Sequence, residues 1–328
     1  MTSIKSEKLI SVVAPFHNNS NCLSQFVENW KKILDFQGEF VEVILVDDHS
    51  TDDFENVLSG SDLSGIKIVH NTGAGGAGDA RNFGLRYAEG TYIYFVDVDD
   101  LVDVQSFGKL VHHVGKSNNN SVDVYHFGFY FTKDHQENPF FSSKNVVSGN
   151  FKIQDAADYI HTLFANGSPY VVWNKLYRRE FIDESNVNFT LNRVAQDAIF
   201  NLRLLPQAKL IDLVDLNVYK YLVGRPNSNS NVNKSKFNDE KQVVSLLASL
   251  LLPKYRDIVS SETVRVSINE LKYLVMSGRF EHDSKPLTEF VDEMNPFGTK
   301  AMILKMILKH SSLRIAFAYF MKLRSKGQ

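Results

Sequence analysis

Residues 91–100 read TYIYFVDVDD, an apolar run that ends directly in a cluster of carboxylates. A short apolar run bounded by polar residues is typical of a buried β-strand. Similar runs come before it at 9–14, 41–46 and 66–69. Segments with helical spacing lie between them, at 24–34 and 79–88. Strands that alternate with helices predict an α/β sheet that contains parallel strand pairs.

The ends of these predicted strands carry clusters of polar residues. They hold residues 15–18 (PFHN), Asp47 and Asp48, the glycine-rich stretch 73–78 and residues 97–100. In open α/β sheets, ligands bind beyond the carboxyl ends of the strands. One edge of the sheet is therefore the predicted functional site.

The second half of the chain changes character. Apolar runs at 122–131 and 210–222 favour further strands, whereas 138–150 favours a loop. Beyond a polar loop that follows the last strand, the pattern turns mostly helical. Its helical segments are 243–252, 263–277, 287–294 and 301–323. We predict an α/β catalytic domain over 1–230 and a helical C-terminal region over 231–328.

The bulk composition excludes several classes of protein. With 328 residues, 43% of them apolar, the chain has the composition of an ordinary globular protein. A net charge of −2 gives no sign of nucleic-acid binding. Cys22 is the only cysteine, which excludes an intrachain disulfide and a cysteine-based zinc cluster. No apolar run approaches the ~20 residues that cross a bilayer, so we expect a cytoplasmic protein.

Charge is unevenly distributed along the chain. From Pro296 onward there is no acidic residue, and the preceding residues carry a formal charge of −9. The basic residues of this last segment are Lys300, Lys305, Lys309, Arg314, Lys322, Arg324 and Lys326. A basic amphipathic helix here predicts either peripheral contact with a membrane surface through residues 300–326 or a helix that packs or self-associates. A homo-oligomer and a location at the inner face of the membrane are therefore both left open.

Asp97 and Asp99 form a candidate metal site. Two carboxylates that lie two residues apart at a strand end can reach a hard cation, and Mn²⁺ or Mg²⁺ often shares such oxygen ligands with substrate phosphates. A turn that ends in an Asp helix cap is the plainer alternative. An EF-hand is excluded because Val102 occupies the position that requires glycine.

The glycine-rich stretch 73–78 supports a competing hypothesis. Its backbone amides could face an anion, and Asp97 follows at about the distance expected of a dinucleotide fingerprint. That pattern predicts an NAD(P)- or flavin-dependent oxidoreductase. The fingerprint should open the first βαβ unit of such a fold, whereas this stretch comes after two strands with polar ends of their own.

Several segments stand in a characteristic order. They are 10–18 (ISVVAPFHN), 43–52 (VILVDDHSTD), 80–84 (ARNFG), 95–100 (FVDVDD), 172–181 (VWNKLYRREF) and 195–200 (AQDAIF). Together they resemble the ordered motifs of the family 2 glycosyltransferases, which have the GT-A fold. The resemblance covers about residues 8–230. It implies an inverting enzyme that moves a sugar from a nucleotide-diphosphate donor, with UDP favoured, to an acceptor hydroxyl in cell-surface glycan synthesis.

The resemblance also implies roles for individual residues. Asp197 matches the general base, and Asp97 and Asp99 match the metal aspartates, while Asp48 matches a position that binds the nucleotide base. The implied nucleotide-sugar-binding residues are Pro15, His17, Asn18, Asp47, Asp48, Gly78, Arg81, Asp97, Val98, Asp99, Lys175 and Arg225. The chain departs from the family pattern at Gln196, where Glu is usual, and at His17, where Tyr is usual.

The chemistry of sugar transfer needs these residue types. An acceptor hydroxyl is a poor nucleophile at neutral pH, so a carboxylate must take its proton. The leaving diphosphate must be neutralised, which a divalent metal does as a Lewis acid. We therefore predict a hexosyl- or N-acetylhexosaminyltransferase that uses Mn²⁺ or Mg²⁺ and acts on a glycan, polymer or lipid-linked acceptor. Two alternatives stay open, the oxidoreductase and a non-catalytic nucleotide-sugar-binding protein.

Overall fold

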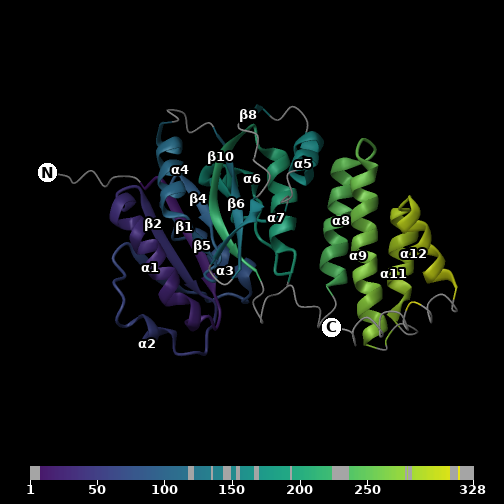
Figure 1. Ribbon diagram of the computed structural model, residues 1–328, viewed down its shortest axis with the longest axis horizontal. Coiled ribbons are helices and arrows are strands. Elements are labelled where there is room, and N and C mark those ends of the chain that lie inside the picture. Colours follow the sequence, from purple (N-terminus) through teal and green to yellow (C-terminus); the bar gives the residue numbers. More distant parts are fainter. Residues whose placement is uncertain are drawn as a thin grey trace. The chain divides into compact units, whose positions relative to one another are not determined.

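The chain forms two compact units, Met1–Pro226 and Asn227–Gln328, each described here by itself (Figure 1). The computed structural model describes residues 8–116, 122–133, 136–142, 149–152, 156–165, 170–192, 194–223, 236–277, 279, 283–310 and 317. The first unit combines a mixed β-sheet with helices, and the second is helical in its described part.

One sheet runs through the first unit, in the strand order β3-β2-β1-β4-β9-β6-β10-β5, with β7 on β6 and β8 on β10. The strands are β1 (Ile10–Phe16), β2 (Val41–Asp47), β3 (Ile66–His70), β4 (Tyr92–Phe95), β5 (Leu101–Val102), β6 (Val124–Lys133), β7 (Gln136–Ser142), β8 (Gly149–Lys152), β9 (Lys175–Arg178) and β10 (Leu210–Leu222). The four strands from β3 to β4 pair in parallel. Strand β9 is antiparallel to both β4 and β6. The predicted α/β fold is confirmed, and its parallel half carries the predicted polar edge.

Helices cover both faces of the parallel half, which is why its strands read as unbroken apolar runs. Alternate residues of a strand point to opposite faces. Val12 of β1 belongs to a core shared with α1 (Ser20–Gln37) and α4 (Val104–Lys116), in which Trp30 packs edge-on against Phe107 with ring centroids 5.3 Å apart. Val13 points the other way, toward α3 (Ala77–Leu85).

The α3 face is packed closely. A Cβ added to Gly84 would lie 2.6 Å from Val13 Cγ1, so the absence of a side chain lets α3 approach the sheet. Farther along the same face, Phe95 of β4 packs against Phe189 and Phe200, whose rings stack 4.0 Å apart. Phe200 lies on α7 (Gln196–Leu204). The sheet therefore holds α3 and α7 on one face, both near the end of β4.

Several boundaries differ from the sequence prediction. The loop predicted over 138–150 is wrong at both ends, because β7 and β8 occupy 136–142 and 149–152. Strand β7 is joined only to β6 among the described strands, and such an edge position tolerates Pro139. The short helices α2 (Phe54–Leu58), α5 (Ala156–Ala165) and α6 (Arg179–Ser185) complete the first unit.

The second unit contains α8 (Phe237–Leu251), α9 (Arg256–Met276), α11 (Lys285–Met294) and α12 (Thr299–Lys309). Their apolar faces meet in one core, to which Phe237, Phe290 and Leu304 contribute. The continuous helix predicted over 301–323 is interrupted in the structure, because α12 ends at Lys309 and His310 is extended. Residues 311–316 and 318–328 lie outside the described residues. Within the described part of the chain, no helix has the length and apolar character needed to span a bilayer.

Candidate active site

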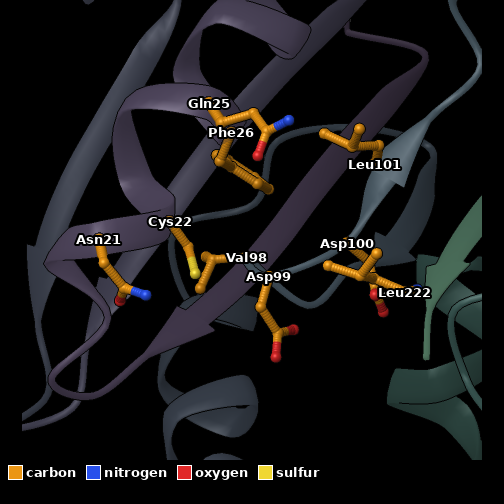
Figure 2. A pocket seen from close by; sticks show the side chains of 9 residues that line it. All are labelled: Asn21, Cys22, Gln25, Phe26, Val98, Asp99, Asp100, Leu101 and Leu222. Carbon is orange, nitrogen blue, oxygen red and sulfur yellow. Dashed lines mark hydrogen bonds between the residues drawn. The ribbon is translucent and has the colours of Figure 1, made fainter. Parts of the chain in front are cut away.

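A pocket of about 220 Å³ lies beside the loop that follows β4 (Figure 2). The first turns of α1 form one wall, and the loop itself, β5 and the end of β10 form the rest. The lining residues are Asn21, Cys22, Gln25, Phe26, Val98, Asp99, Asp100, Leu101 and Leu222. The sequence analysis assigned no role to the α1 residues, because only the fold brings this helix against a loop about 75 residues later.

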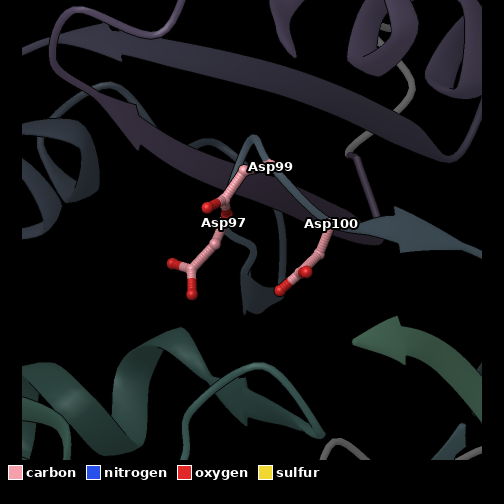
Figure 3. Close-up of side chains that lie close together, drawn as sticks. All are labelled: Asp97, Asp99 and Asp100. Carbon is pink, nitrogen blue, oxygen red and sulfur yellow. The ribbon is translucent and has the colours of Figure 1, made fainter. Parts of the chain in front are cut away.

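Three carboxylates project from this loop. Asp97, Asp99 and Asp100 each offer an oxygen atom, and these atoms lie within 4.8 Å of one another (Figure 3). Asp97 and Asp99 are half-buried, whereas Asp100 is buried. Hard divalent cations prefer such carboxylate oxygens. The pair predicted from the sequence is therefore placed where it could bind a cation, with a third carboxylate beside it.

Asp100 is held by β10. Its Oδ2 lies 2.7 Å from the Tyr219 hydroxyl and its Oδ1 accepts from the Leu222 amide at 2.8 Å. Burial, and then the charge of Asp97, raises the pKa of Asp100 to about 8. A carboxyl group with these bonds fixes the position of the loop. The hydrogen bonds to β10 therefore hold Asp100 in place beside the predicted metal pair, Asp97 and Asp99.

One arginine joins Asp97, a predicted metal ligand, to Asp197, the predicted base. The Arg81 side chain, from α3, is 4% exposed. Its Nη2 donates to Asp97 Oδ1 and its Nη1 to Asp197 Oδ1, both at 2.8 Å. The resemblance placed Arg81 near the nucleotide. In the structure each of its terminal nitrogens bonds one of the two carboxylates, so that Arg81 fixes their separation, and its contact with a nucleotide stays a prediction.

Asp197 lies in the first turn of α7, and 24% of its side chain is exposed. Burial is the largest influence on it and raises the pKa of Asp197 to about 6, although Arg81 acts in the opposite direction. Among the described residues, only Arg81 bonds this carboxylate, through Oδ1. Oδ2 is therefore left to accept a proton. A partly exposed, weakly acidic carboxylate with this geometry suits a general base.

Lys175 does not fit the phosphate contact predicted for it. The side chain is fully buried, and its ammonium donates to Val171 O at 2.8 Å and to Asn174 Oδ1 at 2.7 Å. Burial lowers the pKa of Lys175 to about 7. A fully buried ammonium held by two carbonyl oxygens does not face a substrate in this structure, so the phosphate contact predicted for Lys175 is corrected. Arg225, the other predicted phosphate contact, lies outside the described residues.

The predicted nucleotide end of the site is a network of hydrogen bonds at the ends of β1 and β2. His17 Nδ1 lies 2.7 Å from the Asp48 carbonyl oxygen. Asn18 Oδ1 accepts from the Thr51 amide at 2.7 Å, which ties the two strand ends together. Asp47 accepts from the Ser50 amide at 2.9 Å. Burial tends to raise the pKa of Asp47, but hydrogen bonds from Ser50 and His70 outweigh it and hold the value below the usual one.

The glycine-rich stretch donates its amides to carboxylates of the protein. Gly76 N donates to Asp48 Oδ2 at 2.7 Å, and Gly75 N donates to Asp79 Oδ2 at 3.0 Å. Asn71, which the sequence analysis missed, bonds both carboxylates through Nδ2 at 2.9 and 3.0 Å. A dinucleotide loop must present such amides to a pyrophosphate. The oxidoreductase alternative is therefore wrong for this stretch.

Three further predicted residues are buried. Pro15 and Val98 have buried side chains, and Pro15 stands opposite Val46 in the sheet. A Cβ on Gly78 would lie 2.4 Å from Thr190 O, so this position requires glycine for packing. These residues shape the walls of the site and offer it no polar side chain.

Comparison with known proteins agrees with this geometry. The family description "Glycosyl transferase family 2" matches residues 11–185. The uncharacterized glycosyltransferase EpsJ of Bacillus subtilis (strain 168) is 28% identical over 228 residues, which are 68% of this chain and 62% of EpsJ. The poly(ribitol-phosphate) beta-N-acetylglucosaminyltransferase TarP of Staphylococcus aureus (strain N315) is 26% identical over 243 residues, 70% of this chain and 68% of TarP. The chain thus spans between three fifths and seven tenths of the length of these two relatives.

Solved structures share the fold. Residues 1–349 of S. aureus TarS, in complex with UDP-GlcNAc, superpose with a TM-score of 0.62 at 15% identity, covering 98% of this chain and 92% of that one. The mannosyltransferase PcManGT from Pyrobaculum calidifontis, in complex with GDP-Man and Mn²⁺, gives a TM-score of 0.52 at 15% identity, with coverage of 97% and 87%. The family match spans just over half of the chain and contains strands β2 to β9, Arg81 and the carboxylate cluster, and it shows that this chain belongs to glycosyl transferase family 2.

Proposed function

We propose that this protein transfers a sugar from a UDP-sugar to an acceptor hydroxyl on a cell-surface polymer, with inversion at the anomeric carbon. The observation that carries this proposal is the pair of hydrogen bonds by which Arg81 holds Asp97 and Asp197 beside each other. The S. aureus TarS structure contains UDP-GlcNAc, and TarP is named for transfer to poly(ribitol phosphate). These similarities support a UDP-linked donor and a polymeric acceptor.

Asp97 and Asp99 would hold Mn²⁺ or Mg²⁺. Among the described residues, Arg81 is the only side chain bonded to the Asp97 carboxylate, and it takes Oδ1. Oδ2 therefore stays available to a cation beside Asp99, and both side chains are half-buried. The hard oxygen donors of this pair fit the ion. When bound, it neutralises the negative charge of the leaving diphosphate.

Asp197 is the proposed base. Its free Oδ2 would accept the proton of the acceptor hydroxyl while the hydroxyl oxygen attacks the anomeric carbon and the bond to the diphosphate breaks. Arg81 fixes the carboxylate so that its direction does not change during the reaction. A single displacement of this kind needs no nucleophilic side chain, and its product has the opposite anomeric configuration.

The remaining assignments support the donor end of the site. Asp48, Asp47, His17 and Asn18 form a bonded network at the sheet edge that could receive the nucleotide base. We retain Arg225 as a proposed contact of the diphosphate. The cytoplasmic location, self-association and the membrane contact of residues 300–326 stay predictions from the sequence.

Hydrolysis of the donor tests the proposal without knowledge of the acceptor. We expect slow release of UDP from at least one UDP-sugar in the presence of Mn²⁺ or Mg²⁺, and its loss with excess EDTA. UDP-GlcNAc, UDP-glucose and GDP-mannose would be compared by coupled detection of the released nucleotide. Tight binding of UDP without hydrolysis or transfer would favour the non-catalytic binding protein instead. Full turnover in EDTA would contradict the metal role.

Turnover should also depend on pH in a defined direction. Because the pKa of Asp197 is raised to about 6, the base loses its ionised form as pH falls below that value. We expect kcat/KM to rise with pH through a midpoint near 6 and then to level off, with roughly a tenfold fall per pH unit on the acid side. Steady-state kinetics across this range, with UDP binding measured in parallel, would show it. A profile that stays flat from about pH 5 to 7 would contradict Asp197 as the base.

A further inference from the structure

Helix α12 of the second unit uses only part of its surface to build the core. Ala301, Leu304 and Leu308 are buried, and the two leucines belong to the core cluster of this unit. These three positions share one side of the helix, because residues three and four apart lie on the same face. Within the described residues, Met302, Ile303 and Met306 on the opposite side of α12 are not part of this core.

That opposite side is apolar. Met302, Ile303 and Met306 are 63%, 52% and 50% exposed, and Phe297, just before the helix, is 54% exposed. We call these four residues the α12 apolar face. Scattered exposed apolar residues are ordinary, but Met302, Ile303 and Met306 share one side of the helix by their spacing of three and four residues. Exposed apolar residues gathered in this way are typical of interaction surfaces.

The segment that carries this face is firmly placed. The Phe297 amide donates to Ser260 Oγ at 2.9 Å, and the Ser260 hydroxyl donates to the Phe297 carbonyl at 3.1 Å. The guanidinium of Arg256 lies 5.9 Å from the Phe297 ring centroid. Two hydrogen bonds to α9 therefore hold the backbone of Phe297 while more than half of this residue stays exposed.

Positive charge surrounds the apolar face. At 100° per residue, Lys309 lies next to Met302 and Met306 on the helix, while Lys300 and Lys305 lie at its two margins. Lys300 and Lys309 are exposed, and Lys305 Nζ donates to Asn295 Oδ1 at 2.8 Å. No acidic residue occurs from Pro296 to the end of the sequence. The chemistry of this surface is thus apolar at the centre and cationic at the edges.

We propose that the α12 apolar face docks on an anionic lipid surface. Apolar side chains of an interfacial helix enter the boundary between headgroups and acyl chains, and lysines at its margins meet anionic headgroups. A second copy of the chain is a poorer match. In a twofold interface the same patch meets itself, which would bring the lysines of both copies together, and α12 itself carries no acidic residue to neutralise them.

This docking refines the contact that the sequence pattern suggested. Leu304 and Leu308 belong to the core, whereas Met302 and Met306 are exposed, so the two methionines would meet the membrane. The binding does not depend on the proposed transferase activity. Only its purpose, which is to meet an acceptor at the membrane, rests on that function.

Co-sedimentation of the full chain with vesicles tests the docking. We expect binding to vesicles with about 30% anionic phospholipid and little binding to purely zwitterionic ones. Raising the salt from about 0.1 M to about 0.5 M should release the protein, because the lysine contribution is screened. Equal binding to both kinds of vesicle, or none to the anionic ones at low salt, would overturn the proposal.

Variants separate the two parts of the surface. Met302→Ser combined with Met306→Ser should weaken binding roughly tenfold, and Lys300→Gln with Lys309→Gln should weaken it about fivefold per lysine and reduce the dependence on salt. Phe36→Ser and Lys32→Gln on α1 are matched controls, because Phe36 is 81% exposed and Lys32 lies on the same exposed helix surface. These controls should bind as the parent does.

Two further measurements distinguish the alternatives. Sedimentation velocity without lipid would reveal self-association, and an oligomer that dissociates in the Met302→Ser/Met306→Ser variant would assign the face to a second copy and refute the lipid proposal. Circular dichroism and donor hydrolysis in solution should match the parent in every variant. If a variant loses vesicle binding but keeps its circular dichroism spectrum and its donor hydrolysis, the result supports docking. If the parent protein shows no donor hydrolysis, the proposed transferase function fails, but the vesicle-binding result still tests the docking.

Discussion

Replacing Asp197 with Asn is expected to lower transfer by a factor of roughly 10² to 10⁴, the range that general-base catalysis contributes. The amide keeps the shape of the side chain but cannot take the proton of the acceptor hydroxyl. Arg81 keeps its bond to Asp97, so the metal site should persist. The measurement is kcat for transfer, together with the Kd of UDP with Mn²⁺, which should stay near the parent value.

The control for this variant is Asp183→Asn on α6, an exposed position away from the carboxylate cluster. It should retain parental kcat. Thermal unfolding of both variants would separate a loss of catalysis from a loss of structure, since Asn keeps an acceptor for Arg81 Nη1 but removes the carboxylate charge beside this buried guanidinium, at a cost of about 1–3 kcal/mol. If Asp197→Asn weakens donor binding and leaves kcat unchanged, the residue orders the site and is not the base.

Replacing Asp99 with Asn should abolish metal-dependent turnover, with a loss of at least ~10²-fold, because removal of a charged ligand weakens a Lewis acid that contributes several kcal/mol. Asp99 lies among the three carboxylates whose oxygens fall within 4.8 Å of one another. The binding of Mn²⁺ in the presence of UDP, measured by electron paramagnetic resonance or calorimetry, should weaken in parallel with kcat.

The control for Asp99→Asn is Asp53→Asn, because Asp53 is an exposed aspartate just before α2. It should leave both the affinity for Mn²⁺ and turnover unaltered. Parental Mn²⁺ affinity in Asp99→Asn would show that the cation is held elsewhere, and the metal assignment of the loop would then be wrong. Restoration of activity at high Mn²⁺ concentration would instead agree with a weakened site.

The sequence was sufficient for the parallel half of the sheet. β1, β2 and β4 are buried on both faces, so they read as continuous apolar runs, and each ends in the polar residues that mark the site. The spacing of apolar residues along the sequence did not reveal strands β7 and β8. These strands lie at the margins of the sheet, and the asparagines and Pro139 around them are typical of loops.

The sequence was sufficient to predict which types of residue form the candidate site, but not which of them contact one another. The partners of Arg81 lie 16 and 116 positions away along the chain, and no local pattern encodes that pairing. The phosphate contact predicted for Lys175 was wrong for a different reason. Lysine is usually exposed, and nothing in the sequence showed that the nearby oxygens of Val171 and Asn174 would accept from its ammonium and make its burial tolerable.

The bridge formed by Arg81 has a consequence for how this chain can change over evolutionary time. The charges of Asp97, Arg81 and Asp197 depend on one another, because two carboxylates form ion pairs with the same buried guanidinium. A substitution at any of the three leaves the other two with a charge for which the site was not built. We therefore expect these three positions to co-vary among related sequences. A substitution at one of them should be tolerated only where the other two have changed as well.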